Sequence, residues 1–125
     1  MHARVAVWTI DGEPLESLVV ENPAEVGEWI RVLAGPQGAA GEESFDLLVC
    51  TPTWLAREVA ESGPQVGRHR LIIDTWNAAN VKRVVAEFFE REVADDWLGL
   101  APKLARIGHW EFEDYGEGKP RTQRR

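Results

Sequence analysis

A run of large apolar residues at helical spacing, in the second half of the chain, places the tightest limit on the fold. Its members form one stripe: Val81, Val84, Val85, Phe88, Phe89 and Val93. Charged residues occupy the opposite side, and Asn77 is a suitable N-cap residue. Because an amphipathic helix must bury its apolar stripe against another element, we expect a long helix over 77–93 that covers a hydrophobic core.

Short apolar runs bounded by turn-forming residues predict strands. Residues 4–10 lead into the turn-forming pair Asp11-Gly12, and the apolar run 45–50 ends before Thr51-Pro52. A further run at 68–75 leads to Asn77. Two shorter helices are also indicated, one capped by Thr51 or Thr53 and one by Asp95 or Asp96.

Residues 22–35 fit either a helix or a strand. Asn22 and Pro23 are typical of a helix start, and the apolar residues of this segment follow helical spacing. However, Gly27 inside such a helix costs about 1 kcal/mol, and residues 29–33 also alternate as in a strand. In the strand description, residues 35–41 form a long hairpin loop. The local pattern favours the helix.

The length of the chain limits the number of domains, and its charge and aromatic content indicate the kind of partner. The chain of 125 residues suits one domain over 1–118, followed by a basic tail at 119–125 that we expect to be disordered. All 21 acidic side chains but only 10 basic ones lie in residues 1–118, a balance of −11. Such a field repels nucleic acid and attracts a basic protein. Six tryptophans offer large apolar areas that need burial in the core or in a partner.

The cysteine count and the hydropathy pattern indicate the cellular compartment of the protein. Cys50 is the only cysteine, which rules out an intramolecular disulfide and indicates a reducing compartment. No stretch approaches the roughly 20 apolar residues that span a membrane, and the first apolar run is too short for a signal-peptide core. We therefore expect a cytoplasmic protein that does not bind membranes.

Two separated stretches are distinctive, GPQGAAGEESFDLLVCTPTWL at 35–55 and WEFEDY at 110–115. Both resemble the immunity protein 8 family of bacterial polymorphic toxin systems, and the similarity extends from about residue 22 to residue 115. The resemblance implies an α+β fold with an antiparallel sheet, binding of a cognate toxin, and neither catalytic activity nor a cofactor. It also implies that residues 27–34 form a strand paired with 45–50, and we follow it there.

These observations predict a single α+β domain whose mostly antiparallel sheet is packed by the helix at 77–93 and by shorter helices. Its predicted mechanism is occlusion of the active site or substrate surface of a basic toxin domain, for which a nuclease is a candidate on charge alone. Within the C-terminal motif, an extended chain directs Trp110 and Phe112 to the core and alternate side chains outward. The outward set equally suits a solvated edge strand. The best candidates for partner binding are Glu111, Glu113, Asp114 and Tyr115, and the second are Asp95 and Asp96.

Two other functional classes remain open. The residues that a small metal-dependent hydrolase would use are His109, Glu111, Glu113 and Asp114. Carboxylates are abundant in this chain, the histidines lack ligand spacing, and Cys50 lies in an apolar run that makes a thiol inert. We therefore expect no metal and no cofactor. An acidic adaptor protein unrelated to toxins is the other alternative.

Overall fold

One mixed sheet forms the centre of the computed structural model, which describes residues 1–113. Its strands are β1 (Ala3–Ile10), β2 (Glu13–Pro14), β3 (Gly27–Pro36), β4 (Glu43–Cys50), β5 (Arg70–Ile72) and β6 (His109–Trp110). They follow the order β2-β1-β3-β4-β5, and β6 pairs with the first half of β4. The pairing of β4 with β5 is parallel and the others are antiparallel. The predicted α+β fold is confirmed.

Three α-helices accompany the sheet in the described part of the chain. They are α1 (Pro52–Ser62), α2 (Ala78–Glu90) and α3 (Trp97–Leu104), and a short 3-10 turn, η1 (Leu15–Ser17), follows β2. The side chains of Thr51, Asn77 and Asp96 accept hydrogen bonds from backbone N–H groups of the first turns. Each is a residue that the sequence offered as an N-cap, because its side-chain oxygen satisfies an orphan donor.

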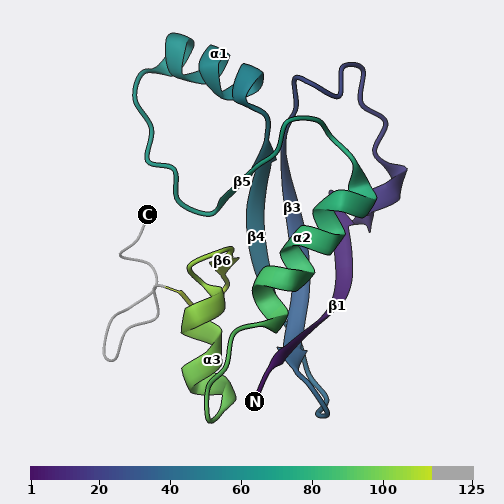
Figure 1. Ribbon diagram of the computed structural model, residues 1–125, viewed down its shortest axis with the longest axis vertical. Helices are drawn as coiled ribbons and strands as arrows, with labels where there is room; N and C mark the ends of the chain where they lie inside the picture. The colour runs from purple at the N-terminus through teal and green to yellow at the C-terminus, as the bar shows by residue number, and fades with distance from the viewer. Residues whose placement is uncertain (114–125) are drawn as a thin grey trace.

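The core lies between α2 and one face of the sheet (Figure 1). Alternate residues of the two central strands point into it: Ile30, Val32 and Ala34 from β3, and Phe45, Leu47 and Val49 from β4. The rings of Phe45 and Phe89 meet edge to face, with centroids 5.3 Å apart. Leu100, Ala101 and Leu104 of α3 are buried in the same cluster. Both helices therefore cover the same face, which we call the helix-covered face.

The helix predicted over 77–93 is shorter than expected. It ends at Glu90, so Val81, Val85 and Phe89 are buried, whereas Val93 lies outside the helix and is largely exposed. Instead, Val93 forms a β-bridge with His2, and the N–H of Ala94 donates to the carbonyl of Met1. The N-terminal residues thus hold the chain in an extended conformation where the apolar stripe alone would continue the helix.

The ambiguous segment is a strand, as the family resemblance implied and against the local helical pattern. β3 pairs with β4 from Gly27 opposite Cys50 to Ala34 opposite Glu43. A Cβ atom at Gly27 would lie 2.0 Å from the Trp54 ring, so only glycine allows this approach. Asn22 caps no helix, and its side chain accepts a hydrogen bond from Ala24. Long-range pairing here outweighs local propensity.

Three further predictions concern a strand at 68–75, the basic tail and membrane-spanning segments. The strand predicted over 68–75 is only Arg70–Ile72. Residues 114–125, which include the predicted basic tail at 119–125, lie outside the described residues. Among the helices of residues 1–113, none has the length and apolar character needed to cross a membrane.

Candidate functional site

The C-terminal motif is not extended as predicted. β6 ends at Trp110, and residues 111–113 turn, with the N–H of Glu113 donating to the carbonyl of Trp110 at 2.9 Å. The turn brings the rings of Trp110 and Phe112 together, with centroids 5.7 Å apart, and both are only partly buried. The assignment of both rings to the core is therefore wrong for Phe112 and only partly right for Trp110, which packs against the core from its margin.

Glu43 anchors two aromatic side chains at this margin. One of its carboxylate oxygens accepts hydrogen bonds from the indole N–H groups of Trp97, at 2.7 Å, and Trp110, at 2.9 Å. Glu43 was not among the residues predicted from the sequence. No local pattern could have found it, because the three residues are far apart in the chain and meet only through the β4–β6 pairing.

Glu113 fastens the C-terminal turn to the segment before β5. Its side chain is only 8% exposed, and its Oε2 lies 2.6 Å from a guanidinium nitrogen of Arg68. Its Oε1 lies 3.0 Å from Nε2 of His69, which is also 2.8 Å from the carbonyl oxygen of Ala105. This carboxylate therefore has partners within the chain.

Glu111 follows α3 and β6 in the chain, whereas Asp95 and Asp96 directly precede α3. Oε1 of Glu111 accepts a hydrogen bond from the N–H of Ser44 at 2.8 Å, next to the β6–β4 pairing. Asp95 and Asp96 are exposed before the first turn of α3, and Asp96 caps that helix through the N–H of Gly99 at 2.9 Å. Asp114 and Tyr115 lie outside the described residues. The structure thus separates the two candidate sets.

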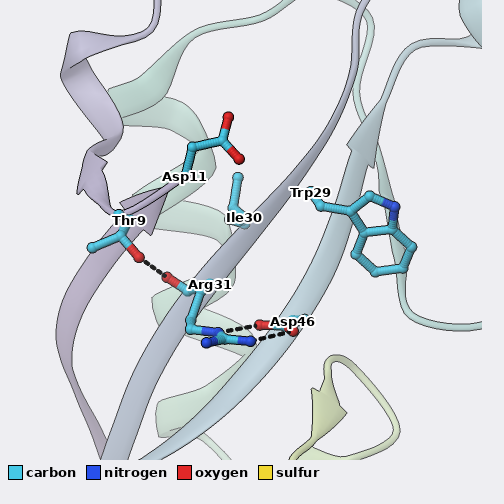
Figure 2. Close-up of a pocket in the computed structure, with 7 residues that line it drawn as sticks. Thr9, Asp11, Trp29, Ile30, Arg31 and Asp46 are labelled. Atoms are coloured by element: carbon cyan, nitrogen blue, oxygen red, sulfur yellow. Dashed lines mark hydrogen bonds and ion pairs between the residues drawn. The ribbon is translucent and has the colours of Figure 1, made fainter.

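The sheet face opposite α2 and α3 carries a polar row across four strands, and we call this face the open face. The strand register places Thr9, Arg31, Asp46 and His109 side by side, and directly opposed residues project from the same face. Arg31 donates to both carboxylate oxygens of Asp46, at 2.8 and 3.0 Å (Figure 2). The hydrogen bonds that Arg31 donates to this carboxylate, and the charge of the carboxylate, raise the pKa of Arg31, and the charge of Glu111 adds to the effect.

A hollow of about 300 Å³ lies on the open face beside this ion pair. Its lining includes Thr9, Asp11, Trp29, Arg31 and Asp46. In Figure 2, Asp11 lies on the β1 side of β3, and the indole of Trp29 extends on the β4 side. Trp29 is 55% exposed, and the other five tryptophans are all at least partly buried. Trp29 is therefore the tryptophan best placed to be buried in a partner.

Asp11 borders this hollow without a matching cation in residues 1–113, and the nearby Glu28 projects to the helix-covered face, opposite Val49. Asp11 lies in the turn after β1 with a left-handed φ of 50°, and Glu28 precedes Trp29 on β3. Burial raises the pKa of Glu28, and the charge of Asp11 raises it further. Within residues 1–113, neither carboxylate forms an ion pair. Glu28 lines a second hollow, of about 420 Å³, together with Glu21 and Glu25.

The described residues contain neither a metal-binding cluster nor an exposed thiol. No group of three or more His, Cys, Asp or Glu side chains in residues 1–113 is arranged to hold a metal ion. The Cys50 thiol is buried on β4, and this burial raises its pKa, which favours the unreactive thiol over the thiolate. Exposed groups of the open face are instead suited to protein contact.

A comparison with known proteins identifies the family to which this chain is similar. The family model described as "Immunity protein 8" matches residues 3–115, which run from the start of β1 through the C-terminal motif. No curated protein and no solved structure matches the chain. Because the family model spans nearly all of the sequence, the chain belongs to the immunity protein 8 family.

Proposed function

We propose that this protein binds a cognate toxin domain and neutralises it by covering the toxin's active site or substrate surface. Membership of the immunity protein 8 family, over residues 3–115, is the observation that carries the proposal. Inhibition of this kind requires a complementary surface and no catalytic group, so the protein acts as a binding partner rather than an enzyme.

The charge of the chain supports a basic toxin. The balance of −11 over residues 1–118 produces an attractive field for cationic surfaces and a repulsive one for nucleic acid. A nuclease fits this description, because its substrate surface must attract phosphate. An acidic inhibitor then competes for the surface that the toxin uses for its substrate.

The carboxylates and the tyrosine of two segments, 95–96 and 111–115, are proposed as the groups that meet the toxin. The set is Glu111, Glu113, Asp114, Tyr115, Asp95 and Asp96. Exposure supports Asp95 and Asp96, and the position of Glu111 beside the polar row supports a contact at the edge of the open face. Glu113 acts mainly by holding this turn in place, since its carboxylate is already engaged by Arg68 and His69.

The cytoplasm is the proposed site of action. The chain's only cysteine is buried and reduced, as in proteins of reducing compartments. A toxin delivered to the cell interior is intercepted there before it reaches its substrate.

A binding experiment with the neighbouring toxin tests the proposal. We expect the gene to follow directly one for a large secreted protein with a toxic C-terminal domain, and that domain, catalytically inactivated, is the probe. Titration calorimetry should give a 1:1 complex, and the bound toxin should no longer bind its substrate. A toxin that does not bind, or that still binds its substrate inside the complex, would refute neutralisation by occlusion.

A further inference from the structure

We propose that the toxin docks on the open face at the start of β3, where it buries the indole of Trp29 and places a Lys or Arg side chain beside Asp11. This inference rests on the proposed function, because the occupant is the cognate toxin. It assigns the centre of the interface to residues that neither the C-terminal motif nor the turn at 95–96 contains.

The open face carries exposed apolar side chains. Trp29 is 55% exposed, and exposed Val7 of β1 and Ile72 of β5 lie on the same face by register. No element of residues 1–113 covers Trp29 as Trp54 of α1 covers Gly27. A large exposed aromatic beside a hollow is the arrangement that supplies most of the binding energy in protein interfaces.

Negative charge also lies beside this indole. Asp11 lines the same hollow as Trp29, and no cation of residues 1–113 forms an ion pair with it. The nearest candidate, Arg31, is held by both oxygens of Asp46. A cation from outside the chain is therefore the missing partner, and Glu21 on the adjoining hollow adds to the attraction.

The charge also selects the occupant. A second copy of this chain, packed about a two-fold axis, would set the same acidic border against itself. A basic protein instead gains an ion pair with Asp11, which has no ion-pair partner in residues 1–113. The toxin that an acidic inhibitor recognises is such a protein, and its Lys or Arg would lie beside the Trp29 ring.

Burial of the Trp29 indole in the toxin is tested by Trp29→Ala, with Leu98→Ala as the control. Leu98 is 79% exposed on α3, on the helix-covered face. With the inactivated toxin domain as probe, Trp29→Ala should weaken binding about 30-fold, the effect of a central aromatic. Leu98→Ala should leave affinity within about twofold, the ordinary result outside such a centre. Equal affinities for the two variants would overturn the proposed docking site.

The ion pair with Asp11 is tested by two single variants that remove the same net charge. Asp11→Asn neutralises the proposed site, and asparagine tolerates the left-handed backbone at position 11. Glu90→Gln removes one charge at the end of α2, on the helix-covered face. Both should slow association alike, but only the first should speed dissociation, by about tenfold or more. Equal dissociation rates would contradict the proposal.

These measurements separate the docking site from the function itself. Asp11→Asn changes one exposed turn residue, so it should fold as well as the wild type, and its result does not depend on how well Trp29→Ala folds. Wild-type protein that fails to bind the toxin domain would refute the proposed function. Wild-type protein that binds, together with variants that all bind equally well, would refute the docking site and leave the function standing.

Discussion

Glu28 is a side chain that reduces the stability of the free protein. Burial, and then the charge of Asp11, raise the pKa of Glu28 above its ordinary value. As pH rises, the unfolded chain therefore loses this proton before the folded protein does, and folding becomes less favourable through that interval. We expect Glu28→Gln to raise the melting temperature at pH 7 and to have little effect at about pH 3, where the carboxyl is protonated in both states.

Thermal unfolding of Glu28→Gln at the two pH values checks this sign. Glu90→Gln, which removes an exposed carboxylate at the end of α2, controls for the loss of net charge. A melting temperature for Glu28→Gln below that of the wild type at pH 7 would show that Glu28 stabilises the free protein.

Cys50 gives a second prediction at the residue scale. Its side chain is fully buried on β4, and burial raises the pKa of the thiol. Alkylation requires the thiolate and access to it, so iodoacetamide should modify the native protein at least about 100-fold more slowly than the denatured chain. Mass spectrometry of timed samples measures both rates. Similar rates in the two states would contradict the burial of this strand.

The C-terminal turn depends on the buried carboxylate of Glu113. Replacing it by alanine leaves His69 without this partner and removes the ion pair with Arg68. We expect Glu113→Ala to lower the free energy of unfolding in urea by about 1–3 kcal/mol, the cost of an unsatisfied buried group.

Glu87→Ala is the matched control for this prediction. Glu87 forms an exposed ion pair with Arg83 one helical turn away, and such pairs contribute about 0.3–0.5 kcal/mol. If Glu113→Ala were no more destabilising than Glu87→Ala, the Glu113 contacts would not hold the turn.

Individual elements differed in how far the sequence could predict them. The caps at Thr51, Asn77 and Asp96 depend on local hydrogen bonds, and they were found from local patterns. β3 was not, because its helical spacing is overridden by pairing along β4, and only the family resemblance indicated the strand. The turn at 111–113 depends on contacts with Arg68, His69 and Ser44, which no local pattern contains.

Across the whole molecule, the open face could not be predicted from the sequence. The six tryptophans were expected to be shared between the core and a partner, but only the topology decides which one is exposed. α2 and α3 both pack on one side of the sheet, so Trp29 is left exposed on the other. The candidate carboxylates at 95–96 and 111–115 follow from composition and motif, and their role in binding stays a prediction.

The net charge of the molecule predicts salt-dependent association. Exposed charges more than about 10 Å apart are largely screened at about 0.1 M salt, and steering by a balance of −11 acts over longer distances. We expect the association rate with the toxin domain to fall about tenfold or more from low to high salt. Stopped-flow measurements over a salt series determine this slope, and a flat series would exclude electrostatic steering.

The most direct test of the account is the survival of cells that express the active toxin domain. Co-expression of the wild-type protein should restore growth, and the Leu98→Ala variant should protect equally well. Protection should be reduced by Trp29→Ala and by Asp11→Asn, at equal protein levels. Cells that die despite abundant, folded wild-type protein would contradict the claim that this chain neutralises the toxin encoded beside it.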